Sequence, residues 1–480
     1  MSVVSSPEFH ETDAADFPER PHLWRSRQLS WDRTAATPTA EAAVADLTAE
    51  LDARAARKRA RKAADRRRVE ATLGAIALDL FVAAGADPER WLAYSRRNED
   101  YAAAKRRYLP VDVTPTAVRE VADFLAGAGY AEAKRGSYRR RAFGGTGYRS
   151  RLRATNKLVA FFAGRGVRLD DVGVRKDAEL IRLKAPALVR GGPKPLLGYD
   201  DTPDTERMRT LLLDWAAVAA RHDIRPPDAR AGGDRPEQDE GEGAGESIDF
   251  QHARLYRVFN NGSWKAGGRF YGGWWMRLPS ALRKQITIDG EAVVELDFKA
   301  LHPRMAYHLC GQPLGAEEDP YDLGGAWAGV DRAIIKVAFN QLLAVGPEDR
   351  IKKPRQAALP RGLSYPKLLA ALEQKHAPIR TWLRSARALE LQHLDSLIAE
   401  GVLGYFTHAL RRPVLPVHDS FLVAAGDEGK LGETMFLAYR AVMNGRSGVE
   451  AWPVVKGWTP GGGAEERVLA TVKSMGKPLG

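Results

Sequence analysis

Several features that define common protein classes are missing from this chain of 480 residues. A single cysteine, Cys310, excludes disulfide bonds within the chain and cysteine-rich zinc sites, and it is expected of a protein in a reducing cytoplasm. No window approaches the roughly 18 uninterrupted apolar residues of a membrane-spanning helix, so no membrane contact is predicted. Residues 1–20 are polar and acidic, which argues against a secretory signal. Neither a Walker A sequence nor His-Glu-x-x-His occurs, so neither a P-loop nucleotidase nor that class of zinc protease is indicated.

Acidic residues are in the minority, with 61 Asp and Glu against 73 Lys and Arg and a formal net charge of +12. An excess of positive charge favours a polyanionic partner such as nucleic acid, although it can also serve solubility alone. The length allows two or three domains, each with its own core.

The N-terminal part of the chain divides by composition. Residues 1–40 are rich in Ser, Thr, Pro and charge and are predicted to be disordered. Residues 41–87 predict an alanine-rich basic helix, for which phosphate contact is slightly favoured over a solvated face. Residues 88–165 predict a helix that Thr114-Pro115 begins and a basic, Gly-containing hairpin that follows it. This order is typical of a DNA-binding winged helix, and a purely structural helical module is the equal alternative. Residues 226–249 predict a flexible acidic linker.

Two carboxylates in distant parts of the chain sit in unusual surroundings. Asp297 ends an apolar strand and leads into an amphipathic helix, where an aspartate can simply cap the helix. Asp419 lies in a His-Asp-Ser cluster that interrupts an apolar hairpin and has no solvation reason to be there. If the two strands are neighbours in one sheet, the carboxylates repel each other unless divalent cations compensate their charge. The sequence therefore predicts a site for two Mg²⁺ ions, with Mn²⁺ as an alternative, suited to phosphoryl transfer.

Five short patterns in residues 250–460 together resemble the family A DNA polymerases. Asp297-Phe298, followed by Arg304 and His308-Leu309, is similar to motif A, and Val417-His418-Asp419 is similar to motif C. Arg332 and Lys336 match the Arg-x-x-x-Lys of motif B on the fingers helix. Gly268-Arg269-Phe270 resembles the Gly-Arg-Leu that precedes the palm strand, and Arg384 and Gln392 fit the helix that handles the template.

The resemblance implies an α+β right-hand polymerase, with palm, fingers and thumb, behind an N-terminal helical, winged-helix-like basic domain. A thumb-like region would cover 166–225, the fingers 318–395, and the palm 250–317 and 396–480. The implied metal ligands are Asp297, Asp419 and the carbonyl of Phe298. Lys336 would neutralise the leaving pyrophosphate, electrostatically or as a general acid. The predicted substrate-binding residues are Arg332, His302, Arg304, Asn340 and His418, and the predicted nucleic-acid-binding residues are Arg269, Arg384, Gln392, Arg139, Arg140, Arg149 and Arg151.

Two of these roles have alternatives, because His418 can orient the primer end or satisfy a buried hydrogen bond, and Arg304 is expected to pair with an acid inside the palm. The chain also departs from the family pattern: the order of the Asn-Phe pair on the fingers helix is reversed in Phe339-Asn340, and three single positions differ. His302 stands where the family has a glutamate that screens against ribose, Ala344 replaces an aromatic residue, and Ser420 follows Asp419 as in single-subunit RNA polymerases.

The predicted function is a magnesium-dependent, DNA-directed DNA polymerase that uses a DNA template-primer and nucleoside triphosphates. The alternatives are a primase-like or RNA polymerase, and a DNA-binding replication initiator with an inactive palm. By analogy alone, a polymerase with an appended DNA-binding module would suit a mobile element. The sequence does not indicate the oligomeric state.

Overall fold

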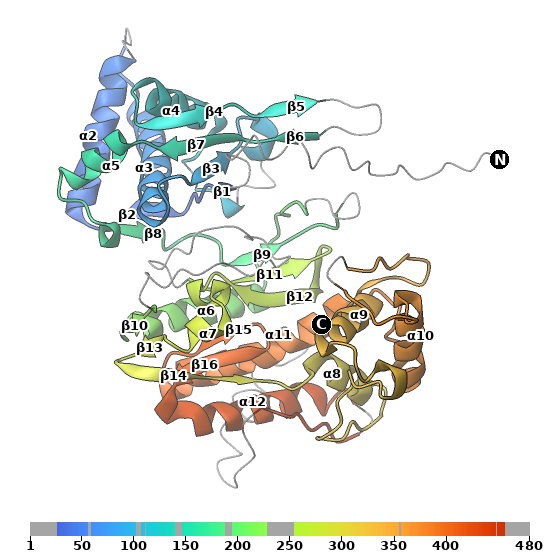
Figure 1. Cartoon of the computed structure of the whole chain (residues 1–480). Coiled ribbons are helices and arrows are strands. Elements are labelled where there is room, and N and C mark those ends of the chain that lie inside the picture. The colour runs from blue at the N-terminus through green and yellow to red at the C-terminus, as the bar shows by residue number, and fades with distance from the viewer. Residues whose placement is uncertain are drawn as a thin grey trace. The chain divides into compact units, whose positions relative to one another are not determined.

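The computed structural model describes residues 26–55, 59–101, 107–110, 112–139, 146–187, 194–227, 254–354, 357–447 and 449–456 (Figure 1). The chain divides into two compact units: the first runs to Glu179 and the second begins at Leu180. Each unit contains helices and sheets, so the chain is α+β, as predicted.

The first unit is built on a mixed four-stranded sheet. Its strand order is β1 (Ser26–Gln28), β3 (Trp91–Tyr94), β7 (Ser150–Ala154) and β4 (Ala131–Lys134). Strand β1 runs parallel to β3, and the other neighbours are antiparallel. Two smaller pairs join β2 (Arg33–Ala35) to β8 (Val172–Val174), and β5 (Ser137–Arg139) to β6 (Thr146–Tyr148). The helices are α2 (Pro38–Arg54), α3 (Ala63–Ala86), α4 (Pro115–Gly127) and α5 (Asn156–Ala163).

Helix α3 forms the centre of this core. Leu73, Ile76 and Leu80 have no exposed surface and lie in one hydrophobic cluster with residues of the sheet and of α4. By length and composition this helix could also cross a membrane, but 72% of its most apolar window is buried inside the protein. Burial of this extent is typical of the core helix of a globular unit.

Three predictions for this region need correction. Residues 26–40 are not disordered, because they form β1, β2 and the start of α2. The single basic helix of 41–87 is two helices, α2 and α3, and the second is largely apolar and buried. Residues 88–165 do not form a separate winged helix, because β3 and β7 belong to a sheet that includes β1 and shares its core with α3. The helix that begins after Thr114 and the hairpin that follows it are present, as α4 and β5–β6.

The second unit contains a five-stranded antiparallel sheet. The order is β10 (Ile224–Arg225), β13 (Thr287–Ile288), β14 (Glu291–Asp297), β16 (Ser420–Ala424) and β15 (Leu415–Val417). Helix α12 (Glu428–Met443) packs on β14 and β16, and its buried residues include Met435 and Tyr439. Trp215 and Trp275 are both buried, and their indole nitrogens donate to the carbonyls of Val414 and Pro416 next to or within β15.

A second sheet has the order β12 (Ser263–Tyr271), β11 (Tyr256–Asn260) and β9 (Ile181–Leu183), and α11 (Ala388–Gly404) packs against β12. The remaining main helices are α6 (Pro203–Ala219), α8 (Leu301–Leu309), α9 (Arg332–Ala344) and α10 (Tyr365–Lys375). A short π-helix over Tyr405–Leu410 continues α11.

Two predicted boundaries fall inside continuous structure. The expected limit between fingers and palm at 395/396 lies in the middle of α11, which is one uninterrupted helix. The expected thumb-like range of 166–225 is split, because β8 pairs with β2 in the first unit while β9, α6 and β10 belong to the second. Most of the predicted acidic linker, 226–249, lies outside the described residues.

Candidate active site

The pairing of β14 with β16 brings the two candidate metal ligands together. Asp297, the last residue of β14, is the register partner of Ser420, the first residue of β16. Asp419 directly precedes Ser420, in the two-residue turn between β15 and β16. The amide of Phe298 donates to the carbonyl of Asp419 at 3.4 Å, so the pairing continues past the ends of both strands. His418, the other turn residue, has a φ of 57°, in the left-handed region that tight turns require.

The two carboxylates are close enough to influence each other electrostatically. Burial raises the pKa of Asp297, and the negative charge of Asp419 raises this pKa further. The ammonium groups of Lys456 and Lys336 act in the opposite direction. Two acids that repel each other, with cations arranged around them, form a site whose charge a divalent metal can balance.

Lys456, which lies in the segment 453–456, was not singled out by the sequence analysis. The residues on either side of Phe298 pair with this segment: the amide of Lys456 donates to the carbonyl of Asp297 at 2.9 Å, and the amide of Lys299 donates to the carbonyl of Val454 at 2.8 Å. Phe298 and Val455 form an antiparallel bridge. These backbone bonds place the Lys456 ammonium in an ion pair with Oδ2 of Asp297.

Helix α9 presents three of the predicted residues on one exposed face. Arg332, Lys336 and Asn340 follow one another at intervals of four residues, while Ile335 and Phe339 on the other side are buried. Lys336 acts on the pKa of Asp297, which places it near the carboxylate pair. Arg332 pairs with Asp319 at 2.6 Å and lies 4.8 Å above the ring of Tyr321.

Arg269, His302 and Asp395 form a compact polar cluster. Arg269 donates from Nε to Asp395 at 2.8 Å, and His302 lies 3.2 Å from the Arg269 guanidinium and 3.5 Å from the carboxylate of Asp395. Burial alone would raise the pKa of Asp395, but Arg269 and His302 outweigh it and hold this pKa at about 2. The charge of Asp419 also acts on Arg269, so the cluster lies next to the carboxylate pair. Asp395 escaped notice because a single acid within a helix carries no pattern.

Two of the predicted residues have other roles. Arg304 is 1% exposed, and it donates to the carbonyls of Leu314 and Gly315 at 2.6 and 3.2 Å rather than to an acid. It therefore fixes a loop inside the protein and is closed to substrate. Arg384 does not share a helix with Gln392. It lies before α11 with a φ of 50° and pairs with Glu373 at 2.6 Å, whereas Gln392 is half-buried within α11.

The predicted DNA-binding arginines of the first unit also differ in their surroundings. Arg149 is exposed and lies 4.0 Å from Asp100. Arg151 is 9% exposed and donates to the carbonyl of Arg149 at 2.6 Å, so it is poorly placed to reach DNA. Arg139 belongs to β5, and Arg140 lies outside the described residues.

In the second unit, the ring of His418 packs edge-on against Tyr271 at 5.8 Å.

The residues around Asp297 fit a magnesium site in which the substrate provides some of the metal ligands. Among the described residues no group of three or more His, Cys, Asp and Glu side chains is placed to hold a metal ion. The available donors are the carboxylates of Asp297 and Asp419, with the carbonyl of Phe298 beside them. Mg²⁺ is commonly bound through one or two carboxylates together with substrate phosphates and water. The Lys456 ammonium on Asp297 shows that this position accepts a cation.

Comparison with known proteins adds little to this geometry. No protein-family model matches the chain, and no curated protein does. A solved structure with some likeness is the POL domain of Pol1 from M. smegmatis in complex with DNA primer-template and dNTP. It is 13% identical, the match covers 82% of this chain and 68% of that chain, and the TM-score is 0.27. At this TM-score the likeness carries no weight, so the functional argument rests on the site itself.

Proposed function

We propose that the second unit is a template-directed nucleotidyltransferase of the family A type, and specifically a DNA-directed DNA polymerase. One observation carries this proposal: Asp297 at the end of β14 and Asp419 in the turn directly before the neighbouring strand β16 lie close together, and the charges of Asp419 and of Lys336 on α9 both act on Asp297. A carboxylate pair next to an exposed basic helix face suits the transfer of a highly charged phosphoryl group.

In the proposed reaction the 3′-hydroxyl oxygen of a primer forms a bond to the α-phosphorus of a nucleoside triphosphate. The bond from that phosphorus to the β-phosphate oxygen breaks, pyrophosphate leaves, and the hydroxyl proton passes to solvent. Asp297 and Asp419, with the Phe298 carbonyl, would hold Mg²⁺, which supplies positive charge to the attacking and leaving oxygens. Lys336 and Arg332 would contact the phosphates, and Lys336 can donate a proton to the departing pyrophosphate.

Lys456 has a role of its own in this proposal. Its ammonium neutralises Asp297 before metal and substrate arrive, which limits the repulsion between the two acids. It would give up this place when Mg²⁺ binds and would then be free to meet a phosphate oxygen. The side chain is 58% exposed, so it has room to move.

Ribonucleotide use is a second candidate, favoured by the setting of His302. This side chain is held by Arg269 and Asp395 at the position where the resembled family has a glutamate. With an imidazole at this position, the glutamate that screens against the ribose 2′-hydroxyl in the resembled family is missing. The same fold could therefore act as a primase-like or RNA polymerase, and the basic first unit would bring the enzyme to its nucleic acid in either case.

Primer extension tests the proposal. The purified chain is given a DNA primer-template, Mg²⁺, and either dNTPs or NTPs, next to the variants Asp297→Ala and Asp419→Ala. We expect extension by the wild type, at least a roughly 10²-fold loss in each variant, and little change in primer-template binding. Extension that survives in either variant would overturn the proposal. Binding without extension in the wild type would favour the inactive initiator instead.

A further inference from the structure

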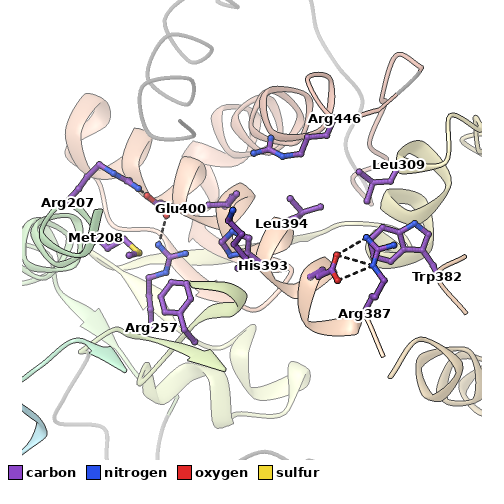
Figure 2. Close-up of a pocket in the computed structure, with 14 residues that line it drawn as sticks. Arg207, Met208, Arg257, Leu309, Trp382, Arg387, His393, Leu394, Glu400 and Arg446 are labelled. Atoms are coloured by element: carbon purple, nitrogen blue, oxygen red, sulfur yellow. Dashed lines mark hydrogen bonds and ion pairs between the residues drawn. The ribbon is translucent and has the colours of Figure 1, made fainter. Parts of the chain in front are cut away.

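Helix α11 has a second polar face, distinct from the one that carries Asp395. Here a cavity of about 330 Å³ opens between α11, α6 and strands β11 and β12 (Figure 2). None of Asp297, Asp419, Lys336 and Lys456 lines it. It borders Leu309, which is at the end of α8 remote from Asp297, so it is separate from the candidate active site.

The cavity has an excess of positive charge. Five of its side chains are basic and two are acidic, which leaves three positive charges in excess: the lining residues are Arg207, Arg257, Lys265, Arg387 and Arg446 against Glu390 and Glu400. His393 also lines the cavity; burial, followed by the charge of Arg257, lowers its pKa to about 4, so it is neutral at neutral pH. An enclosed excess of this size attracts anions.

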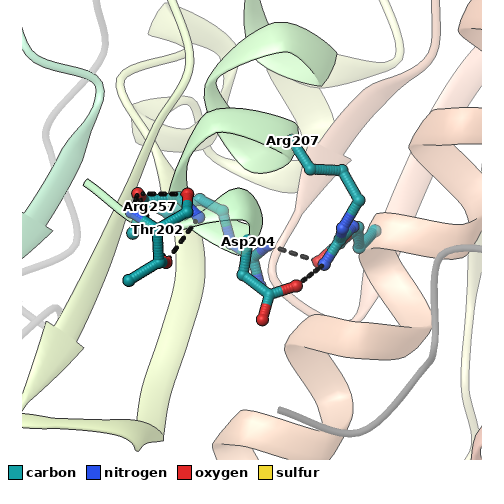
Figure 3. A network of polar contacts seen from close by, with 6 residues as sticks. Thr202, Asp204, Arg207 and Arg257 are labelled. Carbon is teal, nitrogen blue, oxygen red and sulfur yellow. Dashed lines mark hydrogen bonds and ion pairs between the residues drawn. The ribbon is translucent and has the colours of Figure 1, made fainter.

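The two carboxylates are already engaged. Glu400 is 1% exposed and forms ion pairs with both Arg207 and Arg257, and Arg207 also contacts Asp204 at 3.4 Å (Figure 3). Arg257 is equally buried and donates in addition to the carbonyl of Gly268 at 2.8 Å. These bonds tie α11 to α6 and β11 and form the fixed floor of the cavity.

The other acidic residue of the cavity, Glu390, forms its ion pair at the opposite end of the cavity. Glu390 accepts from Arg387 at 2.8 Å, and the Arg387 guanidinium lies 3.8 Å from the centre of the Trp382 ring. Figure 2 shows this stack on the side of the cavity away from Arg207. The stack offers a flat surface of cationic and aromatic character, which suits a nucleic acid base or sugar.

Three polar groups on the cavity wall have bonding capacity left over. Lys265 and Arg446 form no ion pair with any described residue, although Arg446 donates to the carbonyl of Val442. Burial lowers the pKa of Arg446, as expected of a partly desolvated cation without a carboxylate beside it. Nδ1 of His393 is buried and has no hydrogen-bond partner in the part of the chain that the structure describes. Lys265 and Arg446 are exposed overall and therefore accessible to a ligand, whereas the buried Nδ1 of His393 is the group that normally requires a partner, so a ligand that reaches His393 is expected.

We infer that this cavity binds a phosphate group of a nucleic-acid strand, with the nucleotide lying towards Trp382 and Arg387. The inference deepens the proposed function, on which it rests for the identity of the partner. The phosphate would meet Lys265 and Arg446, and a sugar or base group would satisfy His393. A free anion such as pyrophosphate shares this chemistry, so the test includes it.

A salt series of DNA binding tests the inference. The double variant Lys265→Met/Arg446→Met is compared with Arg440→Met, a control in which a basic residue of α12 that already pairs with Glu450 at 2.8 Å is removed. All proteins carry Asp297→Asn, so that no turnover interferes. Fluorescence anisotropy of a labelled single-stranded oligonucleotide gives Kd as a function of salt concentration, and circular dichroism checks the fold.

If the cavity holds strand phosphates, the double variant binds more weakly, and the slope of log Kd against log salt falls by about 0.7 for each phosphate that the protein no longer binds. The control keeps the wild-type slope. An unchanged slope and Kd in a folded double variant would overturn the inference. Pyrophosphate that protects the wild type against heat, but not the double variant, together with unchanged oligonucleotide binding, would mean that the cavity takes the free anion instead. Because the assay requires no catalysis, its result is independent of whether the protein extends primers.

Discussion

Lys456 places its ammonium on Oδ2 of Asp297, and the two residues are also joined through their backbones by a 2.9 Å hydrogen bond from the Lys456 amide. The chain thus returns, after α12, to the strand end that carries the first candidate metal ligand. An ammonium in contact with this carboxylate competes with an incoming metal ion. It also favours the ionised form of Asp297, which is the form that binds a metal.

Removal of this competitor should strengthen metal binding. In Lys456→Met we expect the affinity of the substrate-free protein for Mn²⁺ to rise by about 1.5- to 5-fold, since exposed ion pairs contribute roughly 0.2–1 kcal/mol. Isothermal titration calorimetry or electron paramagnetic resonance measures it. Lys299→Met is the control, because its ammonium bonds to the carbonyl of Ala316 at 3.3 Å. The account of Lys456 fails if metal binding weakens in Lys456→Met or rises equally in the control.

The second prediction concerns Lys336. If it contacts the triphosphate and aids departure of pyrophosphate, Lys336→Met should lower kcat by about 10²- to 10⁴-fold, the usual contribution of a general acid. Primer-template binding should stay the same, because the α9 face is expected to contact the nucleotide. Single-turnover extension with saturating nucleotide measures the effect. Lys367→Met, which removes an exposed lysine of α10 whose ammonium bonds to the carbonyl of Gly362 at 3.4 Å, is the control and should lose much less.

Sugar discrimination forms the third prediction. His302 is tethered to Arg269 and Asp395, and Ala344, the last residue of α9, supplies no aromatic wall. We therefore expect NTPs to be incorporated at a rate closer to that of dNTPs than in family A replicases. His302→Glu should restore discrimination by introducing a carboxylate that a 2′-hydroxyl would have to desolvate. Side-by-side kcat/KM values for dNTPs and NTPs decide this, and strict use of dNTPs by the wild type would refute it.

The low pKa of Asp395 gives a pH-dependent prediction for stability. Because Arg269 and His302 hold this pKa at about 2, below the roughly 3.9 of an aspartate in an unfolded chain, the ionised form stabilises the fold. This contribution is fully present above about pH 4 and is lost as the pH falls towards about 2. The stability difference between the wild type and Asp395→Asn, on the order of 2 kcal/mol at pH 7, should therefore shrink over this range. Urea unfolding at several pH values measures it, and a difference independent of pH would contradict the assignment.

The sequence was informative where one local pattern decided the outcome. An apolar run ending in Asp297, and a hairpin interrupted at His418 and Asp419, predicted both strands and the turn, because alternation and polar interruption are local properties.

Other features depend on contacts between distant parts of the chain, which local patterns do not encode. Lys456 meets Asp297 only because a short bridge forms after α12, and Asp395 is significant only because Arg269 faces it. In the first unit, alanine-rich composition predicted helix correctly but gave no sign that residues 26–28 add a strand beside β3. Helical spacing between Arg384 and Gln392 misled, because the chain turns sharply before α11 begins.

The most direct measurement of the central claim is a structure of the wild-type protein with primer-template, a non-hydrolysable nucleotide and Mn²⁺, using the anomalous scattering of manganese. The account predicts two manganese peaks between the carboxylates of Asp297 and Asp419, with the Lys456 ammonium moved away from Oδ2 of Asp297. A bound nucleotide with no manganese at these carboxylates would contradict it.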